Sequence, residues 1–126
     1  MKSKIVLSGA LFILTGIVLG AFGAHALEKQ LNIEELDSFQ TGVQYQLYHG
    51  LALLVLGFNF DKIKRPSLLC WGIVLGTVLF SGSIYLLAID TLMGIDLSFL
   101  WPVTPLGGTL LIVSWGTLVY QLIRNN

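Results

Sequence analysis

The sequence predicts an all-α integral membrane protein, a bundle of four transmembrane helices forming one domain over residues 1–126. Hydrophobic residues make up 55% of the chain and charged residues 11%, whereas soluble proteins carry about 25% charged residues. The charges also divide the chain into uncharged stretches of 20, 23, 24 and 27 residues, namely 5–24, 38–60, 66–89 and 97–123. About 20 helical residues cross a ~30 Å hydrocarbon layer, so each stretch is long enough to span it.

The first helix is expected over about residues 5–25. Lys2 and Lys4 precede its apolar run, and Ala24-His25-Ala26 has the small-x-small pattern of a signal-peptide cleavage site. However, the uncharged run of 20 residues exceeds the core of about 7–15 residues that a signal peptide carries. We therefore expect this segment to be retained as a membrane span.

The second helix is expected over about residues 33–60. Asn32 followed by Glu35 has the spacing of a capping box, and the acidic residues nearby suit the positive end of a helix. Apolar residues then recur at three- and four-residue spacing: Ile33, Leu36, Phe39 and Val43. This pattern predicts that the first turns are amphipathic and lie along the outer membrane surface.

The third and fourth helices are expected over about residues 66–89 and 105–123. Pro66 opens the third, because a proline in the first turn of a helix loses no needed hydrogen bond. For the same reason Thr104 and Pro105 read as the N-cap and first residue of the fourth helix. Trp101 precedes them, where an interfacial aromatic residue is expected.

The basic residues predict the orientation, since cytoplasmic loops of membrane proteins are enriched in lysine and arginine. Across four helices, only Lys29 falls on one side, amid an acidic loop. The other six fall on the opposite side: Lys2, Lys4, Lys62, Lys64, Arg65 and Arg124. We therefore expect both termini of this multi-pass protein in the cytoplasm.

A polar patch lies within the second uncharged stretch. Polar side chains in hydrocarbon are costly unless they are paired, so we expect the patch to face the interior, together with serines of the third helix. The candidate cluster is Gln44, Tyr45, Gln46, Tyr48, His49, Ser81 and Ser83. Two interpretations stay open: an interhelical hydrogen-bond cluster, which we favour, and a ligand or proton site around His49.

Metal and cofactor sites are disfavoured by the same residues. His25 and His49 lie at different depths, which does not suit axial ligation of a haem. Zinc would need further ligands beside His25, and only Glu28 is near it in sequence. Cys70 is the single cysteine, so it has no disulfide partner in the chain. We expect no metal and no cofactor.

Glycines predict close helix packing. Small residues spaced one or two turns apart let two membrane helices approach, because backbone contact replaces the missing hydrophobic drive. The candidate packing face comprises Gly9, Gly16, Gly20 and Gly23 in the first helix, and Gly72 and Gly76 in the third. The spacing alone leaves open whether these faces pack within one subunit or between subunits.

Five blocks of the sequence resemble one family. They are Gly20–Leu27, Thr41–Gln46, His49–Ala52, Leu79–Ser83 with Tyr85, and Pro102–Gly108. In this order they resemble the small membrane proteins called domain of unknown function 423, to which a mitochondrial transmembrane-256-like protein is related. Val103 departs from the isoleucine common there. The resemblance covers nearly the whole chain. It implies a four-helix, multi-pass protein of the bacterial plasma membrane without an established activity.

The functional expectation is therefore a non-enzymatic membrane protein that packs with itself or with other membrane proteins in the lipid bilayer. No nucleophile motif, phosphate loop or paired carboxylate lies inside a span, which argues against an enzyme. The net charge of zero argues against a nucleic-acid partner. Two alternatives stay open: a small transporter or channel with a polar path at His49, and a redox or quinone-associated protein using His25 and His49.

Overall fold

The computed structural model describes residues 1–125, which form helices joined by short loops. No β-strand occurs among these residues. The helical elements in chain order are α1 (Lys2–Val18), the π-helix η1 (Leu19–Gly23), α2 (Ala24–Leu27), α3 (Ile33–Phe58), η2 (Phe60–Lys62), α4 (Pro66–Ile89), η3 (Ser98–Leu100) and α5 (Val103–Arg124). The all-α prediction is confirmed.

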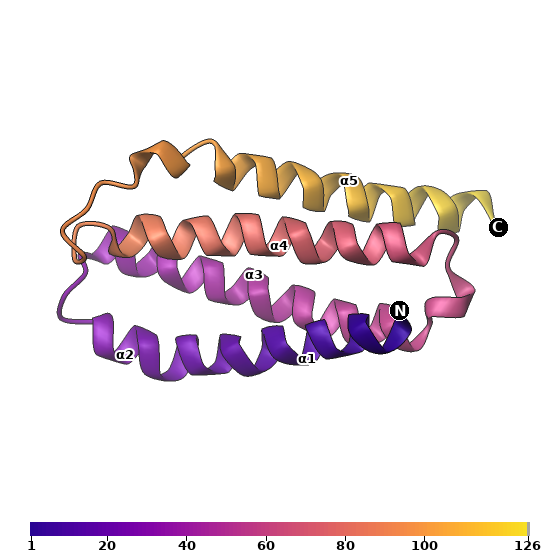
Figure 1. The fold of residues 1–126 in the computed structure, drawn as a ribbon, viewed down its shortest axis with the longest axis horizontal. Coiled ribbons are helices and arrows are strands. Elements are labelled where there is room, and N and C mark those ends of the chain that lie inside the picture. Colours follow the sequence, from indigo (N-terminus) through magenta and orange to yellow (C-terminus); the bar gives the residue numbers. More distant parts are fainter. Residues whose placement is uncertain (126) are drawn as a thin grey trace.

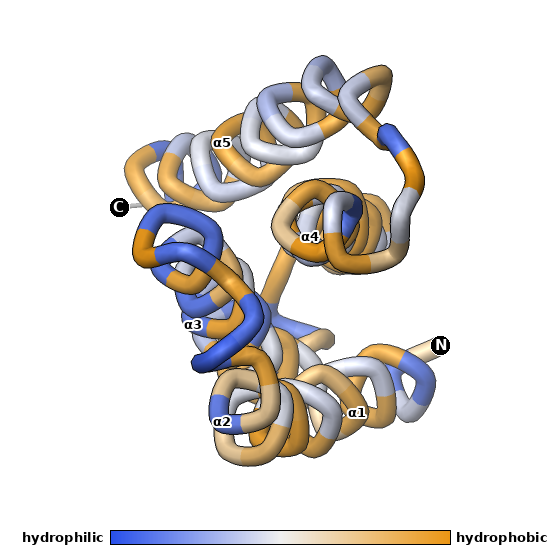
Figure 2. The backbone as a smooth tube through the Cα atoms, turned by 90° about the vertical axis from the view of Figure 1, so that its left-hand side faces the viewer, coloured by the Kyte–Doolittle hydropathy of each residue, from blue (hydrophilic) through white to orange (hydrophobic). Residues whose placement is uncertain are grey.

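The long helices run antiparallel to one another in chain order (Figure 1). The N- and C-termini and the loop between α3 and α4 lie at one end of the bundle, which we call the terminal end. Each helix packs mainly on its neighbour in the chain, α1 on α3, α3 on α4 and α4 on α5. Viewed along the bundle, α3 and α4 lie between α1 and α5 (Figure 2).

The helix boundaries follow the local signals at two of the four starts. A capping box forms at Asn32, whose side chain accepts a hydrogen bond from the Glu35 backbone while the Glu35 carboxylate accepts one from the Asn32 backbone, at 2.8 and 3.0 Å. Pro66 lies in the first turn of α4. These two residues place the starts of α3 and α4 at 33 and 66.

The start of α5 differs from the sequence prediction. Thr104 was expected to cap this helix, but α5 begins at Val103 with Pro102 at the N-cap position. The Thr104 hydroxyl instead lies 2.6 Å from the Ser83 hydroxyl of α4. Pro105 still falls within the first turn, where a backbone N–H has no partner within the helix.

The first helical segment extends without a break from α1 through η1 to α2. Single turns of π-helix insert an extra residue and so rotate the following face of a helix. Gly16, before this turn, faces Leu47 of α3, and Gly20 and Gly23, within it, face Val43 and Phe39. The π-turn thus keeps the glycine face directed at α3 along its whole length.

Three helical segments are long and apolar enough to cross a membrane, namely Lys2–Leu27, Pro66–Ile89 and Ser98–Arg124. Three of the four predicted spans are thus matched by helices of sufficient length and hydropathy. Helix α3 has 26 residues but is not among them. Its first half carries charged and polar side chains, visible as the blue start of α3 in Figure 2.

Two apolar clusters enclose a polar layer. Toward the terminal end, Ile5, Leu53 and Ile73 are fully buried in one cluster. At the opposite end, Phe39 and Val43 pack with Ala88 in the second. Along α3, the buried Gln46 and His49 lie between Val43 and Leu53. The polar side chains are therefore held at mid-length of the bundle.

The loop between α4 and α5 is ordered by two aspartates. The Asp90 carboxylate accepts hydrogen bonds from the backbone N–H groups of Thr91 and Leu97, at 2.7 and 3.3 Å. The Asp96 carboxylate accepts one from the backbone N–H of Ser98 at 2.9 Å. Hydrogen bonds from the backbone and side chain of Ser98 lower the pKa of Asp96, because they stabilise its ionised form.

Candidate functional site

Gln46 joins three helices through its carboxamide. Its Nε2 donates to the Phe12 carbonyl at 2.9 Å and to the Thr15 hydroxyl at 2.6 Å, both in α1. Its Oε1 accepts from the Tyr85 hydroxyl of α4 at 2.6 Å. The Thr15 hydroxyl in turn donates to the Leu11 carbonyl. Gln46, 7% exposed, therefore ties α1, α3 and α4 together.

His49 connects α3 to α5. The Trp115 indole N–H lies 3.0 Å from His49 Nε2, and His49 Nδ1 lies 2.8 Å from the Tyr45 carbonyl one turn earlier. Because an indole N–H can only donate, Nε2 must be the acceptor and Nδ1 must carry the proton. This arrangement selects the neutral Nδ1–H tautomer, and both ring nitrogens are used within the fold.

An aromatic cluster surrounds the imidazole. The Tyr45 ring lies 4.6 Å from the Phe80 ring and stacks at 6.2 Å from the His49 ring, measured between centroids. The Trp115 ring lies 6.0 Å from His49 in a tilted arrangement. Such contacts are favourable for aromatic pairs. They restrict the imidazole to one orientation, as its two hydrogen bonds also do.

The polar patch predicted from sequence is divided by the helix into two faces. Gln46 and His49 are buried, whereas Gln44 is exposed and Tyr48 is 60% exposed. The expectation that all these groups point into the bundle is thus wrong for Gln44 and Tyr48. Each residue of an α-helix is rotated by about 100°, so positions 44 and 48 share the outer face with Leu51. Tyr45 is also exposed, at 38%, although its carbonyl binds His49 and its ring packs on Phe80.

Ser81 and Ser83 of α4 form hydrogen bonds with groups other than His49. The Ser81 hydroxyl donates to the Gly42 carbonyl of α3 at 2.7 Å. The Ser83 hydroxyl lies within hydrogen-bond distance of the Phe80 carbonyl and of Thr104. Both are buried. They therefore join α4 to α3 and to α5, and the partners of His49 are Tyr45 and Trp115 instead.

Three members of this network were not among the predicted site residues: Thr15, Tyr85 and Trp115. Each lies on a different helix from Gln46 and His49, and spacing along one helix cannot identify a partner on another. Thr77 was also missed. It is 1% exposed, and its hydroxyl has no hydrogen-bond partner among the described residues.

His25 and His49 lie in different environments. His25 is in α2, with its imidazole exposed and Nδ1 3.8 Å from the Glu28 carboxylate. His49 is buried in α3. Phe39 of α3 contacts Gly23, near the start of α2, and His49 lies about three turns further along α3, so the two histidines lie at different depths. Cys70 is fully buried in the apolar cluster near the terminal end. Within residues 1–125, no three metal-ligating side chains gather at one place.

All six candidate packing glycines face a neighbouring helix of the same chain. A Cβ at Gly9 would lie 2.7 Å from the Gly50 carbonyl oxygen of α3. A Cβ at Gly72 would lie 2.5 Å from the Ser114 hydroxyl of α5, and one at Gly76 would lie 2.9 Å from the Leu111 side chain. The glycines of α1 therefore serve the α1–α3 contact, and those of α4 serve the α4–α5 contact.

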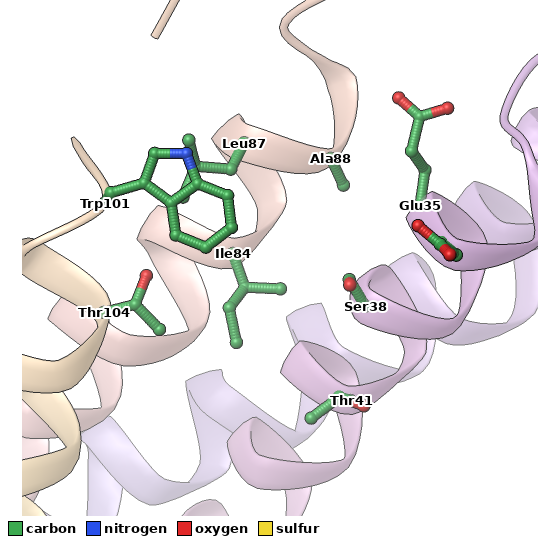
Figure 3. Close-up of a pocket in the computed structure, with 9 residues that line it drawn as sticks. Glu35, Ser38, Thr41, Ile84, Leu87, Ala88, Trp101 and Thr104 are labelled. Carbon is green, nitrogen blue, oxygen red and sulfur yellow. The ribbon is translucent and has the colours of Figure 1, made fainter. Parts of the chain in front are cut away.

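A groove of about 410 Å³ opens between α3 and α5, at the end opposite the termini. Ile84 and Ala88 of α4 line it from one direction, as Figure 3 shows, with Ser38 of α3 and Trp101 on either side. Glu35 lies at its edge, where its carboxylate is already bonded to the Asn32 backbone. Deeper along α3, the stripe that holds Thr41 continues through Tyr45 to His49.

The arrangement is suited to holding helices together. The hydrogen bonds of Gln46 and His49 link α3 to each of the other three long helices. Within residues 1–125 no acidic side chain hydrogen-bonds to Gln46 or His49, and both ring nitrogens of His49 are engaged. Among the buried side-chain polar atoms of the described residues, the Thr77 hydroxyl of α4 alone has no hydrogen-bond partner.

Comparison with known proteins supports the resemblance seen in the sequence. A family model described as "Protein of unknown function (DUF423)" matches residues 19–108. The UPF0382 membrane protein YwdK of Bacillus subtilis is 40% identical over 127 residues, covering 98% of each chain. The UPF0382 inner membrane protein YgdD of Escherichia coli is 41% identical, covering 94% of this chain and 85% of its own. No solved structure matches. The chain thus belongs to the DUF423 family, whose relatives are named as bacterial membrane proteins.

Proposed function

We propose that this chain is a non-catalytic membrane protein with four spans that acts through association with other membrane components. One observation carries the proposal: the buried Gln46 and His49 of α3 use their hydrogen-bonding atoms on partners within the same chain, most of them on other helices. Gln46 makes three such bonds, and His49 engages both ring nitrogens. Polar groups in a membrane interior that are paired in this way contribute to packing.

The proposal includes α3 as the fourth span. This helix packs between α1 and α4, both of which are apolar enough to cross a membrane. Its buried polar groups are paired, which removes most of their cost in hydrocarbon. With four antiparallel spans, the six basic residues all fall at the terminal end. The positive-inside rule therefore supports a cytoplasmic location of both termini.

Thiol labelling tests this orientation. In a Cys70→Ser background, cysteine at Lys29 or Asp96 is expected to react with a membrane-impermeant maleimide in whole cells. Cysteine at Lys64 is expected to react only after the membrane is opened. Both kinds of position lie in loops and are exposed, so access is decided by the membrane alone. Labelling of Lys64→Cys in intact cells would reverse the orientation.

Two substitutions at His49 separate a packing role from a transport role. In His49→Gln the carboxamide keeps a donor and an acceptor, so unfolding in detergent should stay close to wild type. His49→Leu leaves the Trp115 N–H without its acceptor, which costs about 1–3 kcal/mol of stability. The thermal midpoints of the two purified variants measure this difference.

Complementation then decides between the functions. At matched protein abundance, His49→Gln is expected to restore fully whatever growth defect a deletion strain shows. Failure despite normal abundance and stability would contradict the packing role. It would favour a transport path from the groove between α3 and α5 past Tyr45 to His49, since these residues follow one stripe of α3.

A further inference from the structure

A second groove, of about 500 Å³, runs between α4 and α5 at the terminal end. Its volume falls within the range of about 300–1,000 Å³ typical of ligand pockets. The walls are apolar, with Leu75 of α4 and Val113 of α5 both more than half exposed. Arg65, Trp71 and Gln121 also line it. Both helices are long and apolar enough to cross a membrane, and in a membrane the exposed apolar walls of the groove would meet lipid.

Small side chains hollow out this groove. Gly72 of α4 faces Ser114 so closely that a Cβ at Gly72 would lie 2.5 Å from the serine hydroxyl oxygen. Thr117 follows Ser114 by one turn and also lines the groove. The larger Leu75 and Val113 stand beside these positions. The result is a groove along α4 and α5 that is lined mainly by methyl and methylene groups.

The hydroxyls that line the groove are already paired. Ser114 donates to the Leu110 carbonyl and Thr117 to the Val113 carbonyl, each at 2.8 Å. Gln121 exchanges two hydrogen bonds with the backbone of Lys64, at 3.1 and 2.9 Å. The body of the groove therefore offers a ligand apolar contact, while Gln121 ties α5 to the residue preceding Arg65.

Arg65 supplies the one charged group of the lining. Among residues 1–125, ion pairs join Lys2 to Asp61 and His25 to Glu28, and Arg65 takes part in neither. Lys62, Lys64 and Arg124 lie near it in the same loop or at the end of α5. A guanidinium at the mouth of an apolar groove fits a ligand with an anionic end and an apolar body.

We propose that this groove binds an anionic phospholipid, with one acyl chain along α4 and α5 and the phosphate at the Arg65 guanidinium. Guanidinium groups bind phosphate oxygens in bidentate fashion. Basic pockets between membrane helices are typical sites for anionic lipid head groups. Trp71, in the second turn of α4, also lines the groove, and tryptophan is enriched near membrane interfaces. The site is separate from the polar layer at Gln46 and His49.

Native mass spectrometry of the full-length protein in neutral detergent tests the site. The protein is titrated with dioleoyl phosphatidylglycerol and, separately, with dioleoyl phosphatidylcholine, which has the same acyl chains. We expect the anionic lipid to bind more tightly. Arg65→Gln should weaken its binding about tenfold, the effect of losing one charge-assisted contact, without changing the binding of phosphatidylcholine.

Two further variants complete the test. Lys4→Gln removes a basic residue from α1 and leaves the α4–α5 groove intact, so its affinity should match wild type. Thr117→Phe keeps Arg65 but fills the groove, and it should weaken binding as Arg65→Gln does. The proposal would be overturned if the wild type bound both lipids with equal affinity. It would also be overturned if Arg65→Gln and Lys4→Gln lost the same affinity for phosphatidylglycerol, or if Thr117→Phe bound it as the wild type does. An Arg65→Gln variant with wild-type affinity would do so too.

Discussion

Gly107→Ala is expected to destabilise the bundle severely. A Cβ at this position would lie 2.5 Å from the Phe80 backbone nitrogen and 2.9 Å from the Gly76 carbonyl oxygen. Both atoms belong to the backbone of α4 and cannot move aside as a flexible side chain can. The helices must therefore separate. We expect a loss at or above the upper end of the range of about 1–3 kcal/mol usual for overpacking.

Neighbouring glycines of α5 provide matched controls. A Cβ at Gly108 would meet the Phe80 ring at 3.6 Å, an ordinary contact, and one at Gly116 would meet nothing within 4 Å. Gly108→Ala and Gly116→Ala should therefore unfold near the wild-type temperature in detergent. If Gly107→Ala unfolded at the same temperature as these two controls, α4 and α5 would not approach each other closely at Gly107.

Gln46→Leu is expected to have the second-largest effect. It removes three hydrogen bonds that join α3 to α1 and α4. At about 0.6 kcal/mol for each interhelical bond, the loss is roughly 2 kcal/mol. The Tyr85 hydroxyl would also lose its Gln46 acceptor, which adds to the cost. The free energy of unfolding, measured with a denaturing detergent, reports the sum.

Gln44→Leu is the control for this variant. It makes the same chemical change two residues earlier in α3, at an exposed position on the outer face. Leucine is favoured there if that face meets lipid, so stability should be retained or raised. Equal destabilisation by both substitutions would show that the inward hydrogen bonds of Gln46 do not support the bundle.

The starts of α3 and α4 could be predicted because their signals are local. The capping box at Asn32 and the proline at position 66 each act within one turn, and the structure places helix starts there. Thr104 shows the limit of such signals. Its hydroxyl was expected to accept a hydrogen bond from the first turn of α5. It pairs instead with the Ser83 hydroxyl of α4.

The partners across the helices could not be predicted for the same reason. Spacing on α3 shows that Gln46 and His49 share a face, but nothing on that helix identifies Trp115 or Tyr85 as their partners. Gly107 was missed in the same way. Repeated spacing along one helix predicts packing glycines, whereas Gly107 of α5 is recognised only from its contact with the α4 backbone at Phe80 and Gly76.

The order of packing has a consequence for assembly during synthesis. The main contacts join α1 to α3, α3 to α4 and α4 to α5, each pair adjacent in the chain. Short connections make loop closure inexpensive in entropy, so each newly inserted helix can dock on the one before it. The hydrogen bond from Trp115 to His49 spans 66 residues and bypasses α4. It can form only once α5 has entered the membrane, which makes it a marker for the last step of maturation.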